Sequence, residues 1–297
     1  MNSLSAALAR GTVILDGGLG TLLEQRGHDL ASELWSARML IEQPDTIREA
    51  HREFFDAGAQ VGISASYQVS YEGLAAAGLD RAETDRLLAL SVSLVAAARD
   101  ESRAQGWVAA SVGPYGAMLA DGSEYRGDYG LSVAQLREWH APRLRTLMDA
   151  GADVLAIETI PCLAEVEAVL GGIQGSGVPA WLAVTAAMGT LRSGESLAEA
   201  YAMADAIDEI IAVGINCSDP LDVASAIAAA RSVTVKPIVV YPNSGEQWDA
   251  KNRRWMGTPG FPSSLVREWR DAGATLIGGC CRVGPAEISA IGSALKS

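Results

Sequence analysis

Three of the four cysteines follow short apolar segments typical of buried strands. Cys217 follows residues 210–215, whereas the adjacent Cys280 and Cys281 follow residues 275–277 and a pair of glycines. Their spacing is not itself a zinc signature, but strand ends that are distant in sequence converge on one face of a parallel barrel. Three thiolates around a tetrahedral zinc leave one position open, as in a catalytic rather than a structural site. The sequence thus indicates a candidate zinc site.

A thiol substrate would fill the open position of such a site. A metal-bound thiol is deprotonated at neutral pH, and its sulfur stays nucleophilic among three other anionic sulfurs. This arrangement suits alkyl transfer to sulfur. From position alone, an equal alternative is that the three cysteines are ordinary buried thiols, because free cysteine packs as a small hydrophobe. Cys162 begins a helical pattern without a cysteine partner, and we expect it to be structural.

Other barrel chemistries find few suitable residues. The histidines, His28, His51 and His140, form no His-x-His or His-Glu-x-x-His pattern, so a histidine-based hydrolase site is hard to assemble. We expect His51 and His140 to be surface or packing residues. A Schiff-base aldolase requires a lysine near a strand end. None of its candidates is so placed: Lys236, Lys251 and Lys296.

Two carboxylates are placed to bind an amino acid. Asp16 ends the segment 12–15, and Glu158 ends the segment 153–157. Both would face the central pocket and bind an ammonium group, while the amides around Gly17 and Gly18 bind a carboxylate. The alternative for Asp16 is a turn residue before two glycines. The glycine pattern Gly17-Gly18-x-Gly20 lacks the spacing and the following acid of a dinucleotide-binding site.

The elements that must position these residues alternate between strand and helix. The tetrapeptide DAGA occurs at 56–59, 149–152 and 271–274, each time between an amphipathic run and an apolar one, which predicts a helix end followed by a strand. The apolar segments predict eight strands, at 12–15, 60–65, 107–112, 153–157, 180–184, 210–215, 237–241 and 275–277. The clearest helical patterns are 83–102, 133–150, 221–232 and 263–272. We therefore expect an α/β fold, a (β/α)8 TIM-type barrel forming a single domain over residues 1–297.

Two connections are longer than a barrel needs, 113–131 and 241–262, and both follow strands. Long loops at the carboxyl ends of barrel strands are usually lids or binding loops. Four of their aromatic residues could bind a cationic ligand, or else simply pack the loops: Tyr125, Tyr129, Trp248 and Trp255.

Composition excludes several classes of function. The net charge is −13, with 36 acids, 23 bases and no basic run, so nucleic acid is not an expected partner. No apolar segment is long enough to span a bilayer, and the amino terminus lacks a secretory pattern, so we expect a cytoplasmic protein. Four cysteines are too few for a disulfide framework.

The chain resembles the homocysteine S-methyltransferase family over nearly its whole length. The resemblance rests on DGGLGTLLEQRG at 16–27, on VGPYG, ADGSEYRGDYG, ETIP, GINC and YPNSGE, and on the closing GGCCRVGPAEI. It implies that Cys217, Cys280 and Cys281 bind Zn²⁺ and that Asp16 and Glu158 recognise the amino group of homocysteine. It also implies that the homocysteine thiolate attacks a methyl group of a sulfonium or ammonium donor, giving methionine.

For the donor we expect a sulfonium, S-methylmethionine first and S-adenosylmethionine second. Methylfolate chemistry in this family uses additional cobalamin domains, and betaine-using relatives extend beyond the double cysteine, where this chain has 16 residues. The segment 181–188 is more apolar than the resemblance predicts, so the donor side of the pocket could differ. The alternatives are a non-catalytic or divergent thiol- or zinc-binding paralogue, betaine as donor, or a selenium acceptor.

Overall fold

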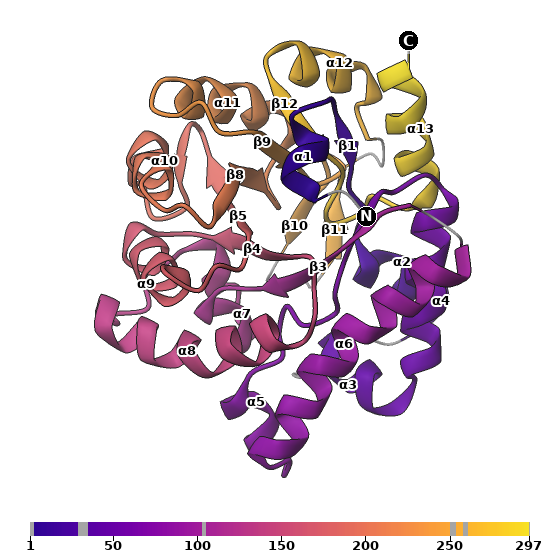
Figure 1. The fold of residues 1–297 in the computed structure, drawn as a ribbon, viewed down its shortest axis with the longest axis vertical. Coiled ribbons are helices and arrows are strands. Elements are labelled where there is room, and N and C mark those ends of the chain that lie inside the picture. The colour runs from indigo at the N-terminus through magenta and orange to yellow at the C-terminus, as the bar shows by residue number, and fades with distance from the viewer. Residues whose placement is uncertain (1–2, 29–34, 103–104, 250–253, 258–260, 297) are drawn as a thin grey trace.

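Eight parallel strands form a closed ring in the computed structural model, which describes residues 3–28, 35–102, 105–249, 254–257 and 261–296 (Figure 1). Their order around the ring is β1-β12-β9-β8-β5-β4-β3-β2, and a parallel bridge between Leu15 and Val61 joins the two ends. The strands are β1 (Val13–Ile14), β2 (Val61–Ile63), β3 (Trp107–Val112), β4 (Val154–Ile160), β5 (Ala180–Val184), β8 (Ile210–Asn216), β9 (Ile238–Tyr241) and β12 (Ala274–Ile277). The predicted barrel is confirmed.

Helices surround the ring and return the chain to the start of the next strand (Figure 1). The four clearest helical patterns form α6 (Arg81–Ser102), α8 (Val133–Asp149), α11 (Val223–Arg231) and α12 (Ser263–Asp271). Helix α11, predicted at 221–232, begins two residues later than predicted, because Pro220–Asp222 forms a 3-10 turn. The other main helices are α2 (Leu19–Gln25), α3 (Trp35–Glu42), α4 (Pro44–Asp56), α5 (Tyr71–Ala76), α9 (Leu163–Ile173), α10 (Leu197–Asp205) and α13 (Pro285–Lys296).

The repeated DAGA motif ends three of these helices as predicted. Its glycines have φ values of +108° at Gly58, +81° at Gly151 and +113° at Gly273. L-residues with a side chain avoid this left-handed region, so glycine allows the chain to leave the helix and enter the next strand. Within the described ranges, none of the helices is both long and apolar enough to cross a lipid bilayer.

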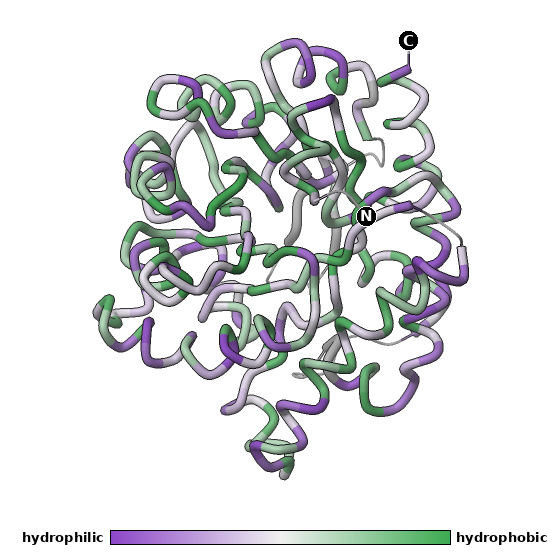
Figure 2. Tube along the Cα trace, viewed as in Figure 1, coloured by the Kyte–Doolittle hydropathy of each residue, from purple (hydrophilic) through white to green (hydrophobic). Residues whose placement is uncertain are grey.

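The apolar core has two layers. Leucine, valine and isoleucine side chains fill the space between the strands and the surrounding helices, and a second cluster fills the inside of the barrel. Hydrophobic residues accordingly run along the central strands, and hydrophilic residues gather on the outer helices (Figure 2). The short helix α1 (Leu4–Leu8) packs Leu4 and Leu8 into the inner cluster and closes the end of the barrel where the strands begin.

Small elements occupy the connections at the opposite end of the barrel. The hairpin of β6 (Ala186–Ala187) and β7 (Thr190–Leu191) follows β5, and the hairpin of β10 (Gln247–Asp249) and β11 (Arg254–Met256) follows β9. The connection after β3 holds α7 (Tyr115–Leu119) and a 3-10 turn at Ser123–Tyr125. Both long connections predicted at 113–131 and 241–262 are present, although the second lies partly outside the described residues.

Close packing between β8 and β9 makes Gly214 sensitive to substitution. A Cβ atom at this position would lie 1.8 Å from the carbonyl oxygen of Val239. We expect Gly214→Ala to lower the free energy of unfolding by about 1–3 kcal/mol, as overpacking does in other cores. Urea unfolding measures this change. Gly11→Ala is the control, because a Cβ at Gly11 meets no atom within 4 Å. An unchanged midpoint for Gly214→Ala would contradict the register described here.

Candidate active site

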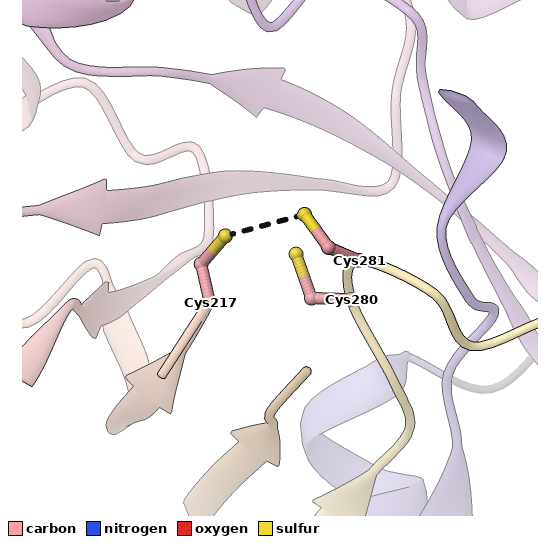
Figure 3. A group of neighbouring side chains, drawn as sticks. All are labelled: Cys217, Cys280 and Cys281. Atoms are coloured by element: carbon pink, nitrogen blue, oxygen red, sulfur yellow. Dashed lines mark hydrogen bonds between the residues drawn. The ribbon is translucent and has the colours of Figure 1, made fainter. Parts of the chain in front are cut away.

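The three predicted cysteines converge at the carboxyl ends of the strands. The sulfur atoms of Cys217, Cys280 and Cys281 all lie within 4.8 Å of one another, and the Sγ atoms of Cys217 and Cys281 are 3.7 Å apart. Figure 3 shows the three side chains pointing toward one another, Cys217 from the end of β8 and the other two from the loop after β12. Residues separated by more than 60 positions thus form one thiol cluster.

The spacing of the sulfurs fits a tetrahedral metal ion. Zinc–sulfur bonds of about 2.3 Å at tetrahedral angles place two sulfurs roughly 3.8 Å apart. The distance of 3.7 Å between Cys217 and Cys281 matches this edge, and the third sulfur lies close enough to complete a triangular face. An ion on this face would keep one coordination position open.

The backbone and neighbouring side chains hold Cys217 in an uncommon conformation. Its φ angle is +50°, in the left-handed region, directly after the last residue of β8. Its amide donates to the carbonyl of Tyr241 at 3.3 Å, and its carbonyl accepts from the hydroxyl of Thr185 at 3.2 Å. The hydroxyl of Tyr125 lies 3.2 Å from the sulfur. Contacts from β9 and from the connections after β3 and β5 therefore fix the direction of this thiol.

The loop after β9 holds the other two cysteines. The amide of Cys280 donates to the carbonyl of Pro242 at 2.8 Å, and the amide of Cys281 donates to Oδ1 of Asn243 at 3.1 Å. Because β12 ends at Ile277, the side chains of Cys280 and Cys281 need not point to opposite faces as they would on a strand, as the sequence predicts. Glycine is required at 279 because a Cβ there would lie 2.1 Å from Val283 Cγ1.

Hydrogen bonds couple the titration of the three thiols. Hydrogen bonds from Cys280 and Cys281 lower the pKa of the Cys217 thiol well below its usual value, with smaller contributions from Tyr125 and Arg192. The pKa of each donor thiol is raised instead, first because of its bond to Cys217. One thiolate is thus already favoured, and a divalent cation would replace the two remaining protons.

The two predicted carboxylates are buried beside the cluster. Asp16 is 2% exposed, and its Oδ2 accepts a hydrogen bond of 2.7 Å from the amide of Ile63. Glu158 is 7% exposed and accepts hydrogen bonds from Ser111 and Tyr241. Glu158 lies within β4 rather than at its end, because the strand continues to Ile160.

Burial of two acids in one site disfavours their charged forms. Burial raises the pKa of Glu158 to about 7 and, together with the charge of Glu158, raises the pKa of Asp16 well above its usual value. Among the residues that the structure describes, no basic side chain forms an ion pair with either acid. Such a pair of acids favours the binding of a cation such as an ammonium group.

The two expected glycine amides differ in their availability. The amide of Gly18 donates to the carbonyl of Val283 at 2.8 Å and is therefore occupied. For the amide of Gly17, no acceptor is found within the described ranges. Gly17 thus remains the candidate for binding a carboxylate next to Asp16.

Two hydrogen bonds between Thr159 and Asn216, here called the Asn216–Thr159 lock, connect the acidic and thiol parts of the site. The sequence alone does not predict them. Thr159 has a φ angle of +61°, and its amide donates to Oδ1 of Asn216 at 2.7 Å. In return, Nδ2 of Asn216 donates to the Thr159 hydroxyl at 2.8 Å. Glu158 and Cys217 are the immediate neighbours of these residues, so the lock fixes their relative positions. Asn216 occurs in the GINC motif, but the motif alone does not reveal its partner.

The other candidate residues lie away from the cluster or outside the described part of the chain. Cys162 is buried at the N-cap of α9, apart from the thiol cluster. His51 and His140 are both buried, so they are packing rather than surface residues. Lys236 donates to the carbonyls of Ala204 and Ile207 before β9 begins, at the opposite end of the barrel. Lys251 lies outside the described residues.

The four loop aromatics have different positions. Tyr125 lies against Cys217, whereas Tyr129 packs against Tyr115 with ring centroids 5.3 Å apart. Trp248 pairs with Trp255 through the backbone of the hairpin β10–β11, and their side chains lie outside the described part of the structure.

The geometry defines a (β/α)8 barrel with a three-cysteine centre at its catalytic face. Residues 13–295 match the family model described as homocysteine S-methyltransferase. The chain is 44% identical to the Bacillus subtilis homocysteine S-methyltransferase YbgG, covering 96% of this chain and 95% of that protein, and 44% identical to the maize homocysteine S-methyltransferase 4, covering 97% and 90%. The metallated form of the Escherichia coli homocysteine methyltransferase MmuM superimposes with a TM-score of 0.88 at 41% identity, covering 98% of this chain and 99% of that one. The chain therefore belongs to the homocysteine S-methyltransferase family and is a methyltransferase.

Proposed function

We propose that this protein uses zinc to transfer a methyl group from a sulfonium donor to homocysteine, forming methionine. S-methylmethionine is the first choice of donor and S-adenosylmethionine the second. The observation that carries the proposal is the cluster of Cys217, Cys280 and Cys281, whose sulfur spacing suits one zinc ion per chain. The whole barrel, residues 1–297, would act as one homocysteine-binding domain in the cytoplasm, where thiols stay reduced.

The acceptor would bind with its thiol toward the cluster and its amino-acid group toward β1 and β4. When bound, zinc supplies a Lewis acid that keeps the acceptor thiol ionised at neutral pH. Asp16 and Glu158 bind the ammonium group, whose charge favours the ionised form of both acids. The amide of Gly17 binds the carboxylate. The Asn216–Thr159 lock keeps this ammonium site at a constant position relative to Cys217.

The transfer itself is a displacement at carbon. The acceptor sulfur forms a bond to the methyl carbon, while the bond between that carbon and the sulfonium sulfur breaks. The electron pair stays on the departing sulfur, which becomes a neutral thioether. With S-methylmethionine, both products are methionine, and the acceptor's thiol proton is released to solvent. The chain contributes orientation of both reactants and exclusion of water.

A sulfonium suits the surroundings of the cluster. Three cysteine sulfurs give this end of the site negative character, and the hydroxyl of the half-buried Tyr125 lies 3.2 Å from the sulfur of Cys217. A soft cation gains from both the negative charge and the aromatic face. Within the segment 181–188, Trp181 packs inside the barrel and donates to Tyr241, while Met188 is 94% exposed at the hairpin tip.

A competition experiment tests the order of donors. Purified enzyme receives deuterated homocysteine with equal concentrations of S-methylmethionine, S-adenosylmethionine and betaine, each carrying a different methyl isotope label. Mass spectrometry of deuterated methionine then identifies the methyl source, and the acceptor label separates this product from methionine formed by the donor. We expect S-methylmethionine to supply the most methyl groups and betaine the fewest. A clear excess from betaine would reject the sulfonium proposal.

A further inference from the structure

Arg192 is held at the base of the β6–β7 hairpin, which follows β5 at the catalytic face. Its amide donates to the carbonyl of Thr185 at 3.2 Å, at the point where the hairpin returns to the barrel. Met188 and Gly189 form the tight turn at the opposite end of the hairpin, with φ angles of +52° and +81°. The backbone of Arg192 is therefore anchored to the barrel rather than carried on an open loop.

The guanidinium of Arg192 contacts the same residues that hold Cys217. Its Cζ atom lies 5.4 Å from the centre of the Tyr125 ring, and its Nε donates to the Thr185 hydroxyl at 3.4 Å. Tyr125 and Thr185 in turn contact the sulfur and the carbonyl of Cys217, respectively. A fixed positive charge thus lies close to the thiol cluster.

The terminal nitrogens of Arg192 remain available for a ligand. Among the residues that the structure describes, no carboxylate lies within ion-pair distance of Arg192, and its hydrogen bond to Thr185 uses only Nε. Arg282 differs, because Glu246 already pairs with it. A half-buried guanidinium with two free terminal nitrogens matches a carboxylate, which accepts two parallel hydrogen bonds in this geometry.

The order of the strands indicates which substrate carries this carboxylate. Around the ring β1-β12-β9-β8-β5-β4-β3-β2, strand β5 lies diametrically opposite β1. The acceptor's carboxylate is assigned to Gly17, directly after β1. In a displacement reaction, the leaving group departs on the side of the methyl carbon opposite the attacking sulfur. The donor therefore extends away from the acceptor's sulfur, and Arg192, at the base of the hairpin after β5, lies across the ring from Gly17.

We propose that Arg192 is a specificity-determining residue that binds the α-carboxylate of an amino-acid sulfonium donor. The inference rests on the proposed function and adds a second amino-acid recognition point to it. S-methylmethionine and S-adenosylmethionine both carry this carboxylate, so Arg192 favours such donors over simple sulfonium ions.

The test compares donors with and without the carboxylate. We expect Arg192→Gln to lower kcat/KM for S-methylmethionine roughly 30-fold and to leave kcat/KM for dimethylpropylsulfonium, the same sulfonium without the amino-acid group, unchanged. The kcat/KM of Arg192→Lys for S-methylmethionine should fall between those of the wild type and Arg192→Gln, because lysine keeps the charge but lacks the two parallel N–H donors of arginine. Arg86→Gln, on the exposed face of α6, makes the same change of charge away from the site and should match the wild type.

Four results would overturn the assignment. Equal losses with both donors, or a loss of bound metal in Arg192→Gln, would show that the residue supports the cluster instead. A loss that disappears when 3-mercaptopropylamine, an acceptor without a carboxylate, replaces homocysteine would assign Arg192 to the acceptor. A wild type that is active with neither sulfonium would reject the proposed function itself, and the Arg192 assignment with it. The other results would reject the Arg192 assignment alone.

Discussion

Cys217→Ala is expected to release the metal and to abolish methyl transfer, and Cys280→Ala and Cys281→Ala should behave alike. Each cysteine supplies one of three sulfurs that lie within 4.8 Å of one another, so two remaining ligands cannot enclose the ion. The loss should exceed the roughly 10–100-fold typical of residues that merely support metal ligands. Elemental analysis should find one zinc per chain in the wild type and much less in each variant, and a methionine-formation assay should show the matching loss of activity.

Cys162→Ala is the matched control for these variants. It removes a buried thiol at the start of α9 that lies outside the cluster, so zinc content and activity should match the wild type. Its effect should be limited to a modest decrease in stability from lost packing. Full zinc and full activity in all three cluster variants would show that the metal site has been misplaced.

Asp16→Asn and Glu158→Gln are expected to weaken homocysteine binding by about 2–5 kcal/mol each, because each removes half of a buried pair that binds the ammonium group. The zinc should stay bound, since neither side chain is a ligand in this assignment. Binding of homocysteine by calorimetry and zinc by elemental analysis test the two parts separately. As a control, 4-mercaptobutyrate lacks the amino group, and its binding should change little. An equal fractional loss for both thiols would remove the ammonium assignment.

The same two substitutions should not destabilise the substrate-free protein. Burial raises the pKa of both acids above the values they have in the unfolded chain. An acid of this kind lowers stability as pH rises through its unfolded pKa, and the loss is complete above its folded pKa, which is about 7 for Glu158. Neutral replacements remove this penalty at pH 7 and above. We therefore expect their Tm values without homocysteine to equal or exceed that of the wild type.

The barrel and the thiol cluster could be predicted because they follow from periodic signals. Apolar segments and the DAGA motif indicate every strand of the ring, and residues at the carboxyl ends of parallel strands must meet. The convergence of Cys217, Cys280 and Cys281 could therefore be predicted without detailed geometry. Asp16 and Glu158 could be assigned to the same face by the same argument.

The contacts that orient these residues could not be predicted. The bond between Asn216 and the backbone of Thr159 spans 57 positions and depends on a positive φ at a β-branched residue, which sequence patterns disfavour. Tyr125 could be selected as an aromatic residue of a long loop, but its hydroxyl contact with Cys217 depends on how that loop folds. The hairpin that presents Arg192 consists of strands of two residues, too short to produce a periodic signal.

Side chains fill the end of the barrel where the strands begin, and this should determine the order in which the substrates bind. Leu4 and Leu8 of α1 pack onto the inner cluster at the end where the strands begin, so the reactants of the proposed function would enter and leave through the opposite end. In the proposed arrangement, the acceptor lies deeper, against Asp16 and Glu158, and the donor covers it. Turnover should then be sequential and ordered: homocysteine binds before the donor, and the methionine formed from homocysteine leaves last.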